Sequence, residues 1–172
     1  QFCIGTGKAN AKCVLMIDGT KVSKISEEWL DRILNDNEIS NTRAWTYSKN
    51  NHSFYIFTVG NETYCYDIST GEWHIRSSRN FYTSKNKPYM PLYAVWFNNK
   101  IITGCCENGN LYVLDDNYYR EDFNETDSLP LYRVRQTPVI TADYKPFVIY
   151  QLSLECNAGC IENYHKLSTC LL

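Results

Sequence analysis

The sequence predicts an all-β protein assembled from repeated blade-like sheets, with one short helix inserted between them. Three observations support this fold class. First, 15% of the 172 residues are aromatic, and large flat side chains suit the pleated surface of β-strands. Second, short apolar runs are separated by Gly-Asn and Asn-Asn pairs, which are turn signals. Third, an apolar strand ends in an aspartate three times, at Asp18, Asp67 and Asp115, with intervals of 49 and 48 residues.

The first predicted element is a hairpin over residues 12–25, "KCVLMIDGTKVSKI". It contains an apolar strand, an Asp18-Gly19 turn and a second strand in which apolar and polar residues alternate. The alternation indicates a strand with one buried face and one solvent-facing face.

The segment that follows, "SEEWLDRILNDN" (26–37), is typical of a short helix. Ser26 is the expected N-cap, and Glu27 and Glu28 suit the positively polarised first turn. Helical spacing predicts an apolar stripe made of Trp29, Ile33 and either Leu30 or Leu34. We expect this helix to be inserted between two blades and packed on a sheet.

The next predicted element is a meander that begins with "HSFYIFTVGNETYCYD" (52–67). Strands Phe54–Val59 and Glu62–Asp67 flank a Gly60-Asn61 turn. Alternation along the second strand predicts that Tyr64 and Tyr66 share one face, and that Cys65 and Asp67 share the other.

A turn over residues 68–72 should connect this hairpin to a third strand that begins at Trp73. Asp67 can accept hydrogen bonds from the backbone amides of the turn, and Gly71 supplies a positive φ. Glu72 could instead form a carboxylate pair with Asp67, as general acid–base chemistry needs. The turn role explains Asp67 without such chemistry, so we interpret this corner as architecture.

The pattern recurs in residues 93–122. A hairpin with an Asn98-Asn99 turn is followed by a Gly109-Asn110 turn and by an apolar strand that ends at Asp115. Exposed polar loops are predicted at 35–42 and 84–91. The acidic loop at 117–128 reads as solvated or as facing a partner. Trp73 and Trp96 have apolar neighbours and are expected in the core.

A period of about 48 residues with several short strands per unit is typical of β-propeller blades. The prediction is therefore an incomplete ring of about three blades, as a piece of a larger propeller or as a chain that closes its ring by oligomerising. Residues 1–155 would form the propeller-like domain and 156–172 a C-terminal tail. Equivalent strands of successive blades are expected at Val14–Ile17, Tyr64–Tyr66 and Leu111–Leu114.

Composition excludes several functions. The net charge is −2 and no basic stripe occurs, so sequence-specific nucleic-acid binding is not expected. No apolar run approaches the roughly 20 residues of a membrane span. His52, His74 and His165 lie far apart in the sequence, and His74 reads as a strand-face residue. No catalytic motif is present, so we predict a protein that is not an enzyme, without catalytic or cofactor-binding residues.

The eight cysteines allow two interpretations. A disulfide framework would suit a secreted protein, whereas free thiols suit the apolar strand positions of Cys13, Cys65 and Cys105, and we favour free thiols. The tail holds a C-x3-C-x4-H-x4-C pattern that could bind Zn²⁺ tetrahedrally. That spacing is one residue from a zinc knuckle, but the glycine and aromatic positions of a knuckle are missing. Free thiols or a disulfide are therefore preferred to a metal site for this set, which comprises Cys156, Cys160, His165 and Cys170.

Taken in order, residues 14–78, 93–115 and 131–155 resemble the later part of the packaged-DNA stabilization proteins of short-tailed bacteriophages. The resemblance covers about residues 13–155 and rests on the order of the strand, helix, meander and blade-edge motifs. It ends at the cysteine-containing tail. These tail hub proteins are built on a propeller, and no catalytic residues carry over from them.

The resemblance implies a virion protein, assembled in the host cytoplasm, that plugs and extends the portal channel after DNA packaging. It implies self-association in a ring, and contacts with the portal adaptor, the tail needle and the tailspikes. The alternative is a cellular or secreted kelch-like propeller that mediates protein interactions.

Overall fold

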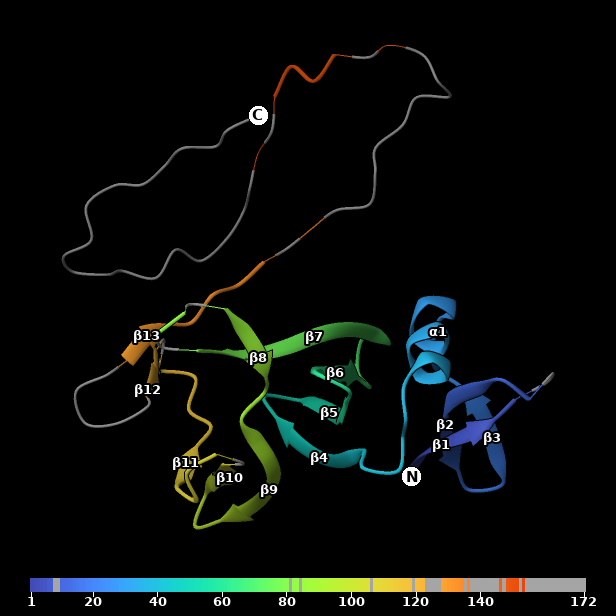
Figure 1. Ribbon diagram of the computed structural model, residues 1–172, viewed down its shortest axis with the longest axis horizontal. Coiled ribbons are helices and arrows are strands. Elements are labelled where there is room, and N and C mark those ends of the chain that lie inside the picture. The colour runs from blue at the N-terminus through green and yellow to red at the C-terminus, as the bar shows by residue number, and fades with distance from the viewer. Residues whose placement is uncertain are drawn as a thin grey trace. The chain divides into compact units, whose positions relative to one another are not determined.

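The fold is that of a computed structural model, shown in Figure 1. The residues it describes are 1–7, 10–80, 82–83, 85–105, 107–118, 120–122, 128–134, 136, 146, 148–151 and 153. The chain divides into two units, residues 1–132 and 133–172. All the described helices and strands belong to the first unit. The predicted tail, 156–172, lies outside the described residues.

The first unit consists of antiparallel sheets and one helix (Figure 1). One sheet has the order β1-β2-β3, a five-stranded sheet the order β4-β5-β6-β7-β8, a third the order β11-β10-β9, and β12 pairs with β13. The element bounds are β1 Phe2–Thr6, β2 Lys12–Asp18, β3 Lys21–Lys24, α1 Glu28–Asp36, β4 Arg43–Lys49, β5 His52–Val59, β6 Glu62–Asp67, β7 Glu72–Arg79, β8 Asn86–Pro88, β9 Pro91–Phe97, β10 Lys100–Cys105, β11 Leu111–Val113, β12 Arg120–Asp122 and β13 Ser128–Pro130. The predicted all-β fold with one short helix is confirmed.

Three of the tight turns lie where the sequence placed them, whereas the Asn50-Asn51 turn between β4 and β5 was not predicted. Asn98 and Asn99 both have positive φ, at 48° and 58°, which is the backbone of a type I′ hairpin turn between β9 and β10. Gly60, with φ of 59°, forms the turn between β5 and β6, and Gly71, with φ of 76°, forms the turn between β6 and β7. Such turns fix the strand register, and therefore which side chains reach each face.

Helix α1 differs from the prediction in its cap and its buried stripe. Glu27 occupies the N-cap and makes no side-chain capping bond. The hydroxyl of Ser26 is instead buried, where it accepts a hydrogen bond from the amide of Val14 at 2.9 Å and donates to Asp31. The buried stripe contains both Leu30 and Leu34, with Ile33 packed beside them, whereas Trp29 is 37% exposed.

Two apolar clusters bury the faces of the five-stranded sheet. The first cluster joins β2, α1 and one face of that sheet through Val14, Leu30, Leu34, Tyr55, Phe57, Val59 and Tyr64. The second cluster lies on the opposite face, where Trp45, Ile56 and Cys65 pack against Ala94 and Leu114. Tyr64 therefore faces the first sheet and Cys65 faces the third, as the alternation predicts.

The repeat predicted from the aspartates is present in the topology. Val14–Ile17, Tyr64–Tyr66 and the strand at 111–113 lie in three different sheets, in β2, β6 and β11. Strands β4 to β7 form a four-stranded meander, β9 to β11 match its first three strands, and β1 to β3 match its last three. This alignment superposes Asp18, Asp67 and Asp115, and it makes β2, β6 and β11 corresponding strands of three sheets.

Three other expectations are corrected. Trp96 was expected in the core but is 63% exposed, at the end of β9 beside the Asn98-Asn99 turn. The loop at 84–91 contains β8, which pairs with β7, and the buried Met90, so it is not a wholly exposed loop. In the acidic loop, Arg120–Asp122 forms β12, whereas residues 119 and 123–127 lie outside the described part.

Candidate functional site

The Asp67 corner is the first candidate site, because it combines a partly buried carboxylate with a histidine. The amide of Ser69 donates to one carboxylate oxygen of Asp67 at 2.8 Å, and His52 Nδ1 lies 2.6 Å from the other. Burial alone would raise the pKa of this carboxyl group, but the His52 contact and the Ser69 hydrogen bond hold the pKa below its ordinary value. Asp67 is therefore an ionised turn residue with both oxygens bonded.

The contact between His52 and Asp67 was missed in the sequence. Its signal is the hairpin register, because Phe54 is the partner of Asp67 and His52 precedes Phe54 by two residues on the same face. Glu72 is the strand partner of Asp67 across the turn, but it is exposed. The oxygens of Asp67 are bonded to His52 and Ser69, so the alternative of an acid–base carboxylate pair has no geometric support.

A caged arginine lies on the same face of the sheet as Asp67, because Arg76 pairs with Thr63, two strand steps of alternation from Asp67. The guanidinium of Arg76 is 5.0 Å from the ring centre of Phe54, 5.5 Å from that of Tyr47 and 5.9 Å from that of Tyr89. Arg76 also donates to the Tyr47 hydroxyl at 2.8 Å and to His74 Nε2 at 3.1 Å. Cation–π contacts of this kind contribute roughly 0.5 to 2 kcal/mol each.

The cage provides a low-dielectric environment for Tyr47 and for the neighbouring thiol of Cys65. Burial raises the pKa of the Tyr47 hydroxyl to about 12 and that of the Cys65 thiol to about 12, although Arg76 opposes both shifts. Both groups are therefore neutral at pH 7 and do not act as nucleophiles. The role of the cage is to hold β4, β5 and β7 to the segment at Tyr89. His74 lies on a strand face, as predicted.

A polar latch connects the five-stranded sheet to the third sheet. Lys49 Nζ lies 3.0 Å from an Asp116 carboxylate oxygen and donates to the Leu114 carbonyl at 2.8 Å. The Asn50 side chain donates to the other Asp116 oxygen at 2.7 Å. These bonds join the turn after β4 to the chain just after β11. Together with the cage and the second apolar cluster, the latch fixes one sheet against the next.

The described cysteines and acidic residues do not assemble a metal site. No group of three or more His, Cys, Asp or Glu side chains converges within the described part of the chain. Cys3, Cys13, Cys65 and Cys105 are free thiols. Cys156, Cys160, His165 and Cys170 lie outside the described residues, so their state stays a prediction. In the same described part, no helix has the length and apolar character needed to cross a membrane.

The first, five-stranded and third sheets follow one another along the chain, and two apolar clusters pack each against the next, face to face. This arrangement defines a β-propeller-type protein. The chain belongs to the family described as Bacteriophage P22 Gp10, beta-propeller, whose model matches residues 1–119. This finding confirms the resemblance to phage DNA-stabilization proteins and favours it over a cellular kelch-like module. The match stops before residues 131–155, where the predicted resemblance continues. Neither a curated protein nor a solved structure matches the chain.

Proposed function

We propose that the protein is a non-enzymatic component of the tail hub of a short-tailed phage, where it helps to plug and extend the portal channel after DNA packaging. The observation that carries the proposal is the family match over residues 1–119, which covers the three packed sheets. The family is one of phage DNA-stabilization proteins, and the proposal specifies how this member acts.

The net charge of the chain argues against direct binding to the DNA backbone and favours closure of the channel. Binding to the DNA backbone is driven by lysine and arginine side chains that displace counterions. This chain has 17 such residues against 19 acidic ones, and its net charge is −2. Several of the described cations already have protein partners, as Lys49 has in Asp116 and Lys87 has in Glu107. Mechanical closure by packed sheets needs no phosphate contacts.

The proposed partners are other proteins of the virion. They are the portal adaptor, the tail needle and the tailspike, together with further copies of the same chain in a ring. The proposed location is the assembled virion, reached from the host cytoplasm. Large apolar side chains that remain exposed on the third sheet, such as Phe97 and Leu111, provide surface for such contacts.

A knockout of the gene in its phage tests this function. We expect particles that package DNA and then lose it, measured as nuclease-sensitive DNA released from purified heads. Complementation with the unaltered gene should restore DNA retention, and so should complementation with the Ile75→Thr variant, because the β-branched Ile75 is exposed on strand β7. Particles that retain their DNA without the protein, or purified virions that lack it, would contradict the proposal.

A further inference from the structure

The connection between β10 and β11 contains the Asn108-Gly109 pair, which is the one Asn-Gly pair in the sequence. Residues 107–110 of this connection are all exposed. Gly109 has φ of 69°, a backbone conformation that glycine adopts at little cost because it has no Cβ. Asn108 is therefore a solvent-exposed amide followed directly by the residue type that shields its own backbone nitrogen least.

Two hydrogen bonds hold the side-chain amide of Asn108. Its Oδ1 accepts a hydrogen bond from the Asn110 amide at 3.0 Å, and its Nδ2 donates to the Tyr112 hydroxyl at 2.9 Å. A donor aimed at a carbonyl oxygen stabilises the negative charge that develops there when a nucleophile attacks the carbonyl carbon. This donor belongs to Asn110, so the bond does not occupy the Gly109 nitrogen, which is the neighbouring nucleophile.

We propose that Asn108 is a modification site, at which the side-chain amide is lost through a cyclic imide formed with the Gly109 nitrogen. In the first step this nitrogen loses its proton and bonds to Asn108 Cγ, the Cγ–Nδ2 bond breaks, and Nδ2 leaves with a proton as ammonia. Water then adds to one of the two imide carbonyls and breaks its bond to the nitrogen. Opening at the side-chain carbonyl gives aspartate, and opening at the main-chain carbonyl gives isoaspartate. No electrons are transferred, and water is the co-reactant.

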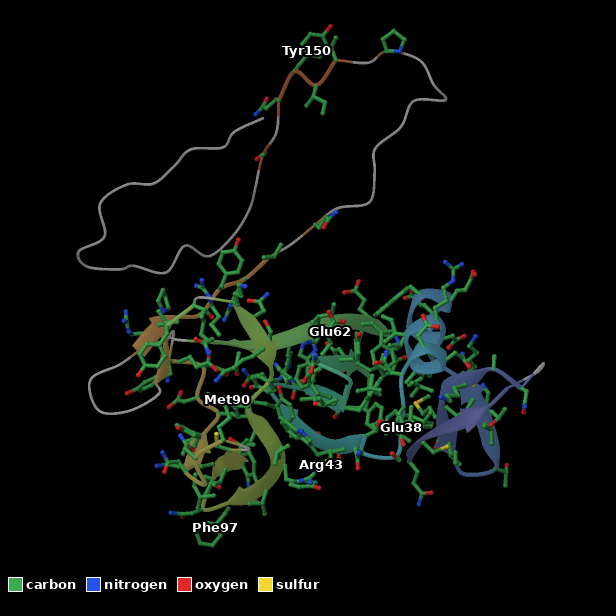
Figure 2. The ribbon with its side chains drawn as sticks, in the orientation of Figure 1. Glu38, Arg43, Glu62, Met90, Phe97 and Tyr150 are labelled. Atoms are coloured by element: carbon green, nitrogen blue, oxygen red, sulfur yellow. The ribbon has the colours of Figure 1, made fainter. Side chains whose placement is uncertain are left out.

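The asparagine turn between β9 and β10 lacks this combination. Asn98 and Asn99 are exposed and have positive φ, and the labelled Phe97, which precedes them, projects outward from the end of β9 in Figure 2. The residues that follow these two asparagines are Asn99 and Lys100, whose side chains crowd the nitrogen that would attack. Exposure and turn geometry are thus common to both loops, and the following glycine distinguishes Asn108.

The two products weaken the pairing of β10 with β11. The amide of Cys105 donates to the Asn110 carbonyl at 3.0 Å, and this bond closes the connection. Isoaspartate adds one atom to the main chain inside the closed connection, whose present length fits the register of the two strands. Aspartate keeps that length, but it places a second carboxylate beside Glu107 and removes the donor to Tyr112.

The proposal goes beyond the tail-hub function and does not depend on any phage partner. It concerns the chemistry of one loop, and the purified full-length chain is sufficient to test it. A failure here would leave the virion experiment unaffected, and a failure of the virion experiment would leave this reaction intact.

The experiment follows the purified chain by peptide mass mapping during incubation at mildly alkaline and mildly acidic pH. We expect the peptide that contains Asn108 to gain the mass of the amide-to-acid change and to separate into aspartate and isoaspartate forms. Conversion should be faster at alkaline pH, because the attacking nitrogen must lose its proton. The peptide that contains Asn98 and Asn99 is the internal reference, and it should convert at least about tenfold more slowly, because no glycine follows either asparagine.

Three variants, each checked by circular dichroism, locate the reaction. Asn108→Gln moves the carbonyl one carbon further from the attacking nitrogen and should abolish the acidic forms. Gly109→Ala adds a Cβ beside that nitrogen and should slow conversion at least about tenfold. Asn117→Gln is the matched control, because Asn117 is exposed and is followed by Tyr118, and it should leave the conversion of Asn108 unchanged.

Stability measurements test the effect on the third sheet. The urea midpoint of the incubated chain should fall below that of the fresh chain, whereas incubated Asn108→Gln should keep its midpoint. Three results would overturn the proposal. They are an Asn108 peptide that converts no faster than the reference peptide, an Asn108→Gln variant that accumulates acidic forms as the unaltered chain does, and a Gly109→Ala variant that converts at the unaltered rate. An unchanged midpoint in the converted chain would overturn the effect on strand pairing.

Discussion

Truncation of Trp73 to alanine should cost about 3 kcal/mol of unfolding free energy. The Trp73 ring is partly buried, with its centre 4.9 Å from that of Tyr66 and 5.8 Å from that of Phe57. Its indole N–H donates to the Ile25 carbonyl at 2.8 Å. Full burial of a tryptophan is worth about 3 to 5 kcal/mol on truncation. Because Trp73 is only partly buried, its packing contributes less than that figure. Loss of the hydrogen bond to Ile25 adds about 1 kcal/mol to the cost.

The matched variant is Trp96→Ala. Trp96 is 63% exposed on β9, and exposed substitutions usually change stability by less than about 0.5 kcal/mol. Urea unfolding followed by far-UV circular dichroism, at one fixed protein concentration, would measure both changes. Trp73→Phe divides the effect, because it keeps an aromatic ring but removes the donor to Ile25, and it should cost about 1 kcal/mol. Equal losses for Trp73→Ala and Trp96→Ala would refute the assignment of strand faces.

Three further predictions concern a turn, a thiol and a carboxylate. Gly60→Ala should cost about 2 kcal/mol of stability and Gly19→Ala about 1 kcal/mol. Both glycines have positive φ, but only at Gly60 would the new Cβ meet a neighbour, Asn37 Oδ1 at 2.8 Å. Calorimetric melts that reverse this order would contradict the prediction. Cys65 should resist alkylation at pH 8 while the partly exposed Cys105 reacts, since burial raises the pKa of the Cys65 thiol to about 12. Equal labelling of the two cysteines, measured by peptide mass mapping, would count against a buried Cys65 thiol. Asp67→Asn should be less stable than the unaltered chain at pH 7, and the difference should shrink as the pH falls below about 4. The reason is that a carboxyl group whose pKa is lowered in the folded protein contributes stability that is lost when the group is protonated. A difference that does not change with pH in chemical melts would show that the ionised carboxylate is not its source.

Local patterns in the sequence contain most of the fold. The Asn98-Asn99 turn and the strand at Glu62–Asp67 were correctly placed, because turn chemistry and period-two alternation depend on near neighbours in the chain. The three aspartates were interpreted as marks of a repeat, and they follow strands of three different sheets, since Asp18 and Asp67 end β2 and β6, and Asp115 comes two residues after β11. The same reasoning identified Asp67 as architecture.

The candidate site depended more on contacts between distant residues. The cage around Arg76 combines Tyr47, Phe54 and Tyr89, which come from separate strands and a loop. Ser26 was expected to cap the helix, but its hydroxyl bonds to the Val14 amide in another element. Such partners cannot be predicted from the local propensities of residues, because they depend on how separate helices and strands pack together.

By itself the sequence determined the fold class, the short helix, and the Gly60, Gly71 and Asn98-Asn99 turns, because each of these depends on interactions within a few residues. Only the tertiary structure decided which face of each sheet is covered. The exposure of Trp96 and of Val95 shows this, since apolar strand residues read alike in sequence whether or not a neighbouring sheet lies against them. Burial is a property of two surfaces, and a strand's sequence specifies only one of them.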